Sequence, residues 1–351
     1  MKILLTVALV LFILSGCNQR HPASTPGFII ANGQMPGLVK DKDGSLQMVY
    51  GTGDTILYAF SSNDGKSFSA SSIIAVLPGL AASHMRGPQI AASGSGIIVT
   101  ASNKAGNIFS FHKDAQGKWS SPLKVNDADT VAKEGLMALS ANDDNAFAVW
   151  LDLRENNKNK IYGARSADGG RTWMKNILVY ASPDTTVCEC CKPSVLVNGP
   201  SVYVMFRNWL HGNRDMYLVQ SNDGGNSFGL AQKLGKGHWN LNGCPMDGGG
   251  ITLNDEGKIE TVWRREGKIY SSIPGMEERE IGEGKGCTIE SVNNKNVYAW
   301  IENGDIVFTD TRGQKTILGK GTQPVLKALN DSQVICVWEN EKQIHASILK
   351  I

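Results

Sequence analysis

The chain has 351 residues, and its 35 lysines and arginines nearly balance its 33 aspartates and glutamates, for a formal net charge of +2. Because no concentrated basic stretch stands out, nucleic acid is excluded as an expected partner. Glycine is frequent, at 39 residues, and proline, asparagine and aspartate are scattered evenly along the chain. This composition favours many short strands joined by turns, and no segment has the pattern of an amphipathic helix.

The N-terminus has the order of regions found in a secretory signal. Lys2 supplies a positive start, residues 3–14 are apolar apart from one threonine, and Leu14-Ser15-Gly16-Cys17 closes the stretch. The apolar run is too short to remain in a bilayer as a spanning helix. Its last four residues resemble the bacterial lipobox, in which the cysteine is acylated and becomes the mature N-terminus. An ordinary secretory signal is the alternative.

We therefore expect residues 1–16 to be a lipoprotein signal peptide and Cys17 to carry acyl chains such as palmitate. Residues 17–27 then form a polar tether. This interpretation predicts a membrane-anchored protein of the bacterial cell envelope that faces the periplasm or the cell exterior.

One short motif occurs three times, at Ser61–Phe68, Ser166–Trp173 and Ser221–Phe228, and a worn copy lies at His112–Trp119. Its closing aromatic residues recur at nearly even intervals. Aspartate or asparagine and glycine favour a tight turn, and the aromatic side chain packs beneath the hairpin. The motif resembles the Asp box (BNR repeat), Ser-x-Asp-x-Gly-x-x-Trp, of sialidases and other β-propellers. We expect its role to be structural and assign no catalysis to its aspartates.

A second repeat consists of apolar runs of strand length, each followed after a turn by another strand. The first strands of the seven pairs are Leu46–Tyr50, Ile97–Ala101, Ala146–Trp150, Val202–Phe206, Ile259–Trp263, Val297–Trp300 and Val334–Trp338. Their partners are Ile56–Phe60, Ile108–His112, Ile161–Arg165, Met216–Gln220, Lys268–Ser272, Asp305–Thr309 and Gln343–Ile348.

These repeats predict an all-β protein in which residues 28–351 form a β-propeller of four-stranded blades. Seven strand pairs indicate seven blades. The sialidase propeller has six, so six is the alternative if one short C-terminal unit is irregular. The last blade lacks an outer strand, and Gly27–Ala31 is an apolar segment that would supply it and close the ring.

In such a blade, the Asp boxes connect the third and fourth strands and therefore mark one face of the propeller. The crossings between blades and the loops between second and third strands then meet on the opposite face. Loops gathered on one face of a rigid scaffold commonly carry function. The segments in question are 81–88, 151–160, 184–193, 207–215, 236–249 and 264–267.

The resemblance to sialidases implies a glycan site in which arginines hold a carboxylate and an aspartate acts as acid. On the predicted loop face, the candidate substrate-binding residues are Arg86, Arg154, Arg207, Arg214 and Arg264. The candidate catalytic acids there are Asp152, Asp215 and Asp247. The chain departs from the family in having no arginine between Arg20 and Arg86, and it offers no assignable Tyr/Glu pair. Ion pairing between loops is the alternative role of the arginines.

Four cysteines fall in two consecutive crossings: Cys188, Cys190 and Cys191 in one and Cys244 in the next. Thiolates of this kind are soft ligands suited to Cu(I) or Zn. A disulfide between Cys244 and one of the other three is the alternative, since an extracytoplasmic location permits it. Free thiols are a third possibility. Cys336 lies inside a predicted strand and is expected to be a buried free thiol.

Together these features predict a lipid-anchored, monomeric, sialidase-like propeller that binds a glycan or hydrolyses a glycoside at its loop face. Two alternatives stay open. One is a Cu, Zn or thiol site built on the propeller, and the other is a scaffold for a protein partner.

Overall fold

In a computed structural model of the chain, residues 23–24, 27–184 and 186–351 are described, and every regular element among them is a β-strand. Cys17, the predicted signal peptide and most of the predicted tether lie outside the described residues. Within the described part, no helix has the length and hydropathy needed to cross a bilayer.

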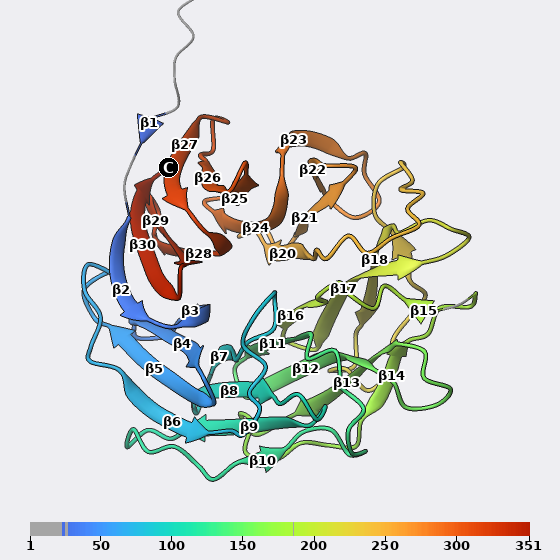
Figure 1. The fold of residues 1–351 in the computed structure, drawn as a ribbon, viewed down its shortest axis with the longest axis horizontal. Coiled ribbons are helices and arrows are strands. Elements are labelled where there is room, and N and C mark those ends of the chain that lie inside the picture. The colour runs from blue at the N-terminus through green and yellow to red at the C-terminus, as the bar shows by residue number, and fades with distance from the viewer. Residues whose placement is uncertain (1–22, 25–26, 185) are drawn as a thin grey trace, which may run out of the picture.

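The strands form seven sheets arranged as blades around a central axis (Figure 1). The strands of each blade are given from the innermost to the outermost. Blade 1 contains β3 (Gln34–Lys40), β4 (Leu46–Thr52), β5 (Thr55–Ser61) and β6 (Ser72–Val76), and blade 2 contains β7 (Gln89–Ser93), β8 (Gly96–Ser102), β9 (Ile108–Lys113) and β10 (Leu123–Lys124). Blade 3 contains β11 (Met137–Asn142), β12 (Asn145–Asp152), β13 (Lys160–Ser166) and β14 (Ile177–Tyr180).

Blades 4 to 7 follow the same order. Blade 4 contains β16 (Ser194–Asn198), β17 (Ser201–Trp209), β18 (Met216–Ser221) and β19 (Gln232–Lys233), and blade 5 contains β20 (Gly249–Leu253), β21 (Ile259–Arg265), β22 (Lys268–Ser272) and β23 (Arg279–Glu283). Blade 6 contains β24 (Lys285–Val292), β25 (Lys295–Glu302), β26 (Asp305–Thr309) and β27 (Lys315–Lys320). Blade 7 contains β28 (Thr322–Asn330), β29 (Gln333–Asn340), β30 (Gln343–Lys350) and β2 (Phe28–Asn32). Two short strands are added at edges, β15 (Thr186–Val187) on β17 and β1 (Ala23–Ser24) on β27.

The ring is closed by the N-terminal strand β2, which pairs antiparallel with β30 and completes blade 7. Each innermost strand also contacts the innermost strand of the next blade, and β28 contacts β3 to complete the circle. The predicted all-β fold, the count of seven blades and the closing strand are therefore confirmed, and the alternative of six blades is wrong.

The core consists of clusters of buried side chains between neighbouring blades. Between blades 3 and 4, for example, Phe147 and Val149 of β12 pack with Val204 and Phe206 of β17. Each such side chain contributes about 1.5–3 kcal/mol through burial. The tryptophans that end the predicted first strands are at most 1% exposed, and they are Trp150, Trp263, Trp300 and Trp338.

The Asp boxes are turns between the third and fourth strands of blades 1, 3 and 4. In the box of blade 3, the Ser166 hydroxyl donates to Asp168 at 2.7 Å and accepts from the Gly170 N–H at 2.9 Å. The Asp168 carboxylate also accepts from the Thr172 N–H. Burial of Asp168 opposes its ionisation, but these hydrogen bonds prevail and lower its pKa. The side-chain hydrogen bonds described for this carboxylate all lie within the turn, which agrees with its expected structural role.

The last glycine of each box joins its blade to the preceding one. Gly65, Gly170 and Gly225 have φ of +75°, +84° and +86°, a conformation that disfavours other residues. A Cβ on Gly170 would lie 2.9 Å from Ile98 of blade 2, and one on Gly225 would lie 2.6 Å from Phe147 of blade 3. The box therefore needs glycine both for its backbone and for contact between blades.

We expect Gly170→Ala to lower the free energy of unfolding by about 1–3 kcal/mol more than Gly313→Ala, because overpacking against Ile98 adds to the backbone strain. Gly313 is a matched control: it lies in the corresponding turn of blade 6 with φ +81°, and nothing lies within 4 Å of its added Cβ. Urea denaturation of both variants measures the difference. Equal losses would show that contact between blades plays no part.

Candidate functional site

The loop face contains a pocket of about 780 Å³ at the axis of the propeller. Its wall is formed where the crossings enter the innermost strands, so that every blade contributes residues to it. Among them are His84 and Met85 before β7, Lys192 before β16, and Met246 and Asp247 before β20. The expected gathering of these crossings on one face is therefore observed.

Several residues of this pocket have a strained backbone. Met35, His84, Met85, Met246 and Gln323 line it and have φ between +46° and +70°, although none is glycine. Such conformations cost of order 1–3 kcal/mol each and gather at ligand-binding and catalytic sites. The lining is held in one arrangement by the surrounding blades.

Two lysines of the pocket lining, Lys192 and Lys285, form no ion pair with a carboxylate among the described residues. The Lys192 ammonium donates to the Gln89 side-chain oxygen at 2.9 Å, and burial lowers its pKa to about 8. Lys285 is exposed at the start of β24 and also lines the pocket. Glu339, on the blade 7 side, accepts from the Gln34 amide and the Met35 N–H. The wall around Lys192 therefore has unbalanced positive charge.

Of the three candidate acids, Asp247 lines the pocket. One carboxylate oxygen accepts from the N–H groups of Gly248 and Gly286, at 2.8 and 3.1 Å. The other oxygen is buried, accepts no hydrogen bond from the described part of the chain, and lies 3.7 Å from the Arg264 guanidinium. Burial raises the pKa of Asp247, and the charges of Arg207 and Arg264 oppose this shift without cancelling it.

The other two candidate acids have partners away from the pocket. Asp152 is buried and accepts from the Trp150 indole at 2.7 Å and from the Arg154 guanidinium. Asp215 accepts from the Trp239 N–H and lies 2.8 Å from the His238 ring. Their described contacts are those of loop-stabilising groups.

The five candidate arginines do not converge on a single point. Arg86 pairs with Glu134, and Arg154 pairs with Asp152 and Asp127. These contacts correspond to the alternative of ion pairing between loops. Arg264 lines the pocket beside Asp247.

Arg207 and Arg214 lie behind the pocket wall. Arg207 is 2% exposed and donates to the backbone carbonyls of Arg214 and Arg264, at 2.7 and 2.9 Å. Arg214 stacks on the Trp209 ring, with its guanidinium carbon 4.4 Å from the ring centroid. Arg214 also donates to the sulfur of Cys188 at 3.1 Å and to Glu189 at 3.3 Å.

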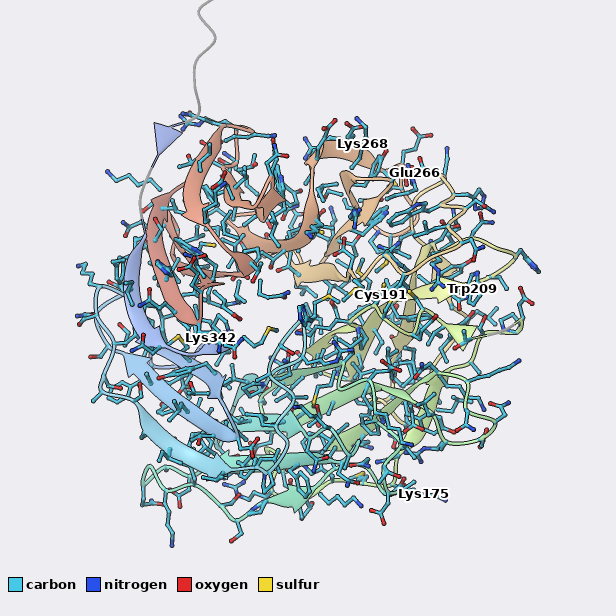
Figure 2. All side chains as sticks on the ribbon, viewed as in Figure 1. Lys175, Cys191, Trp209, Glu266, Lys268 and Lys342 are labelled. Carbon is cyan, nitrogen blue, oxygen red and sulfur yellow. A yellow bond between two sulfur atoms is a disulfide. The ribbon has the colours of Figure 1, made fainter. Side chains whose placement is uncertain are left out.

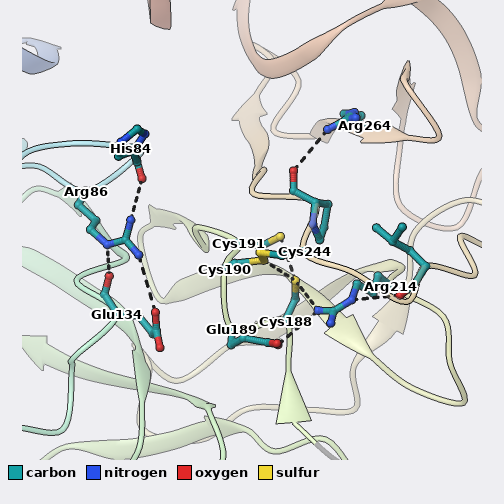
Figure 3. Close-up of a disulfide and its surroundings, with 12 residues drawn as sticks. His84, Arg86, Glu134, Cys188, Glu189, Cys190, Cys191, Arg214, Cys244 and Arg264 are labelled. Carbon is teal, nitrogen blue, oxygen red and sulfur yellow. Dashed lines mark hydrogen bonds and ion pairs between the residues drawn. A yellow bond between two sulfur atoms is a disulfide. The ribbon is translucent and has the colours of Figure 1, made fainter.

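The four cysteines of the two crossings lie close together (Figure 3), and Cys244 lines the pocket. Cys190 and Cys244 form a disulfide, which is the disulfide alternative drawn from the sequence. Cys188 and Cys191 are buried free thiols whose sulfurs lie 3.0 Å apart. The sulfurs of Cys188, Cys190 and Cys191 all lie within 4.8 Å of one another. Cu or Zn ligation by all four cysteines would need the disulfide to be reduced, and it stays a prediction.

The two free thiols have different acidities. When Cys188 is ionised, the Cys191 thiol donates a hydrogen bond to it, and with the charges of Arg207 and Arg214 this lowers the pKa of Cys188 to about 7. Burial and the neighbouring Cys188 raise the pKa of Cys191 well above its usual range. Burial likewise raises the pKa of Cys287 and of Cys336, the expected buried free thiol.

Two features of the site were not predicted from the sequence. One is that Lys192 and Lys285 line the pocket. The sequence feature that could have indicated this is their position, because Lys192 lies just before the innermost strand β16 and Lys285 is the first residue of the innermost strand β24. The other is that Cys188 and Cys191 form a Cys-x-x-Cys pair, which was visible in the sequence but obscured by Cys190.

No protein-family model and no curated protein sequence matches the chain. Among solved structures, a polysaccharide lyase (ulvan lyase) matches with a TM-score of 0.53 and 10% identity, over 92% of this chain and 95% of its own. An α-L-arabinofuranosidase from Fusarium graminearum matches with a TM-score of 0.52 and 10% identity, over 93% and 98%. An intramolecular trans-sialidase from Ruminococcus gnavus has a TM-score of 0.46 and 12% identity, over 94% and 95%. At 10% identity, the likeness to the lyase and the arabinofuranosidase concerns the propeller fold alone.

A titration of the Cys188 thiol tests the placement of Arg214 and Cys191 around the Cys188 sulfur. Because the pKa of Cys188 is about 7 and those of Cys191, Cys287 and Cys336 are raised, we expect one step near neutral pH when thiolate absorbance is titrated. Arg214→Gln should move that step to higher pH, since the cation at 3.1 Å is lost. Arg86→Gln, which changes an arginine away from the cysteines, should leave it in place. An unchanged step in Arg214→Gln would contradict the assignment.

Proposed function

We propose that the protein is a carbohydrate-binding propeller of the cell envelope whose axial pocket holds a saccharide bearing a carboxylate or sulfate group. The observation that carries this proposal is Lys192, an ammonium in the pocket wall whose described partner is an amide oxygen. A charge removed from water without a counterion is unfavourable, which is why the pKa of Lys192 falls to about 8. An anionic ligand would supply the missing partner.

The rest of the pocket suits a sugar. Lys285 and Arg264 add further donors, and the Gln323 amide and the Gln34 side-chain oxygen can bond hydroxyls. The strained lining residues are already in place, so binding would require little ordering of the protein. Two solved propellers of similar shape are described as an arabinofuranosidase with an iminosugar inhibitor and a lyase bound to a saccharide containing GlcA.

The contacts favour binding over hydrolysis. Glycoside cleavage commonly needs two carboxyl groups placed across the scissile bond. Asp247 and Glu339 are the carboxyl groups in the described lining of the pocket, and Glu339 already accepts hydrogen bonds from Gln34 and Met35. Asp152 and Asp215, the other candidate acids, are occupied by their own loops. This leaves Asp247 without a second free carboxylate to act with it.

We expect an oligosaccharide containing uronic acid to bind more tightly than the same oligosaccharide with its carboxyl groups reduced to alcohols, as measured by calorimetry. Lys192→Met should weaken binding of the acidic ligand about tenfold or more, since hydrogen bonds between charged partners are worth about 1.5–3 kcal/mol. Lys175→Met is the matched control, because Lys175 is exposed at the outer rim of the ring (Figure 2).

A set of acidic and sulfated saccharides that shows no binding would refute the proposal. Equal binding of the acidic and the reduced ligand, or equal losses in the two lysine variants, would also count against it.

We also propose that Cys17 is acylated and holds the propeller at a membrane, because the preceding residues have the lipobox pattern. Cells that produce the full chain should incorporate radiolabelled palmitate into it, and the protein should partition into the detergent phase. Cys17→Ser should lose both properties, whereas Cys336→Ser should keep them. Equal labelling of Cys17→Ser and the unaltered chain would place the lipid elsewhere or exclude it.

A further inference from the structure

Beside the saccharide pocket, and independently of what that pocket binds, four sulfurs lie close enough to react with one another. The Cys190–Cys244 disulfide has Cys188 next to it, with the sulfurs of Cys188 and Cys190 3.7 Å apart. Cys191 is within 3.0 Å of Cys188 on its other side. A chain of sulfurs therefore runs from Cys244 through Cys190 and Cys188 to Cys191.

The two ends of this chain differ in exposure. Cys244 is exposed and lines the pocket, whereas Cys188 and Cys191 are 0% and 2% exposed. One end of the sulfur chain is thus open to molecules from outside, and the other is enclosed by protein.

The surroundings of Cys188 favour its reactive form. Arg214 donates to its sulfur at 3.1 Å, and the fixed, buried Arg207 adds a second positive charge nearby. A thiolate, and not a thiol, is the nucleophile in thiol–disulfide exchange. Cys191, whose sulfur lies 3.0 Å from that of Cys188, is placed to attack Cys188 after Cys188 has bonded to Cys190.

The geometry points to a thiol–disulfide exchange centre in which one disulfide moves between an exposed pair, Cys190–Cys244, and a buried pair, Cys188–Cys191. In the first step, the Cys188 thiolate attacks the Cys190 sulfur. The Cys188–Cys190 bond forms, the Cys190–Cys244 bond breaks, and its electron pair leaves on the Cys244 sulfur.

In the second step, Cys191 attacks the Cys188 sulfur, and the Cys188–Cys191 bond forms as the Cys188–Cys190 bond breaks. The electron pair of the broken bond leaves on the Cys190 sulfur, which takes up the proton of Cys191, so that Cys244 remains as the thiolate. One disulfide and two thiols are present before and after, so the exchange needs no outside oxidant. The outside partner of the centre is a thiol or disulfide that reaches Cys244 from the pocket side.

Alkylation under native conditions tests this exchange, because it traps Cys244 when its sulfur is released. The oxidised full chain is treated with iodoacetamide, unfolded in acid and digested, and its disulfides and labels are mapped by mass spectrometry. We expect label on Cys244 together with a Cys188–Cys191 disulfide. The peptide that contains Cys17 is mapped separately.

The variants separate the two steps. Cys188→Ser should abolish the label on Cys244 and retain the Cys190–Cys244 disulfide. Cys191→Ser should keep the label and accumulate a Cys188–Cys190 disulfide. Cys336→Ala is the matched control, since Cys336 is buried in β29 of blade 7, and it should behave as the unaltered chain.

Three outcomes would overturn the exchange. They are an unaltered chain whose Cys244 takes no label, label on Cys244 that persists in Cys188→Ser, and a purified chain whose four cysteines are all thiolates bound to Cu or Zn. The first outcome is measured on the unaltered protein, so the exchange can be refuted even if a variant fails to fold.

Discussion

The pairing of β2 with β30 is the constraint on which the rest of the architecture depends. Blade 7 receives three strands from the end of the chain and its fourth from residues 28–32, so the ring closes only when the two ends of the propeller meet. Gly27 allows this approach, because a Cβ there would lie 2.2 Å from the Trp338 ring. Closure covers the outer edge of β30, which would otherwise be open to pairing with another chain. It also fixes the circle of innermost strands whose first residues form the pocket.

The fold was predictable from the sequence because its signals are local and repeat. The first strand of a pair, such as Ala146–Trp150, is an apolar run of the right length. Each Asp box encodes its own turn through contacts within a few residues, as between Ser166 and Gly170. Seven similar units then leave a closed ring as the arrangement that buries every blade face. The need for Gly170 against Ile98 joins two blades and emerged only from the structure.

The site was less predictable, because its contacts join residues distant in the chain. The sequence placed Arg154 and Arg264 on the same face, yet Arg154 pairs with Asp127 of an earlier crossing while Arg264 lies at the axis. No local pattern distinguishes these two outcomes. The crossings also take backbone conformations that their residues disfavour, as at His84 and Met246. Such conformations are imposed by the surrounding blades, so they cannot be predicted from the conformational preferences of the residues themselves.

Arg207 shows how an arginine beside the pocket can take no part in binding a carboxylate. A guanidinium that binds a ligand carboxylate needs two adjacent N–H groups free to point at it. Both terminal nitrogens of Arg207 already donate to the carbonyls of Arg214 and Arg264, and the side chain is buried. Its positive charge nevertheless favours the ionised form of Cys188 on one side and of Asp247 on the other, and so acts to lower the pKa of both groups. Arg207 thus serves as a fixed positive charge between the cysteines and the pocket.

The same two crossings carry both the sulfur chemistry and the charged wall of the pocket. Lys192 follows Cys191 directly, and Asp247 lies three residues after Cys244, so the Cys190–Cys244 disulfide ties together the segments that hold these two groups. Opening this disulfide would release the covalent link between the segments while leaving β16 and β20 paired within their own blades. Lys192 and Asp247 are then positioned by their blades alone, and Met246 loses one of the restraints on its left-handed backbone. The oxidation state of the cysteines and the shape of the pocket are therefore physically linked through these few residues.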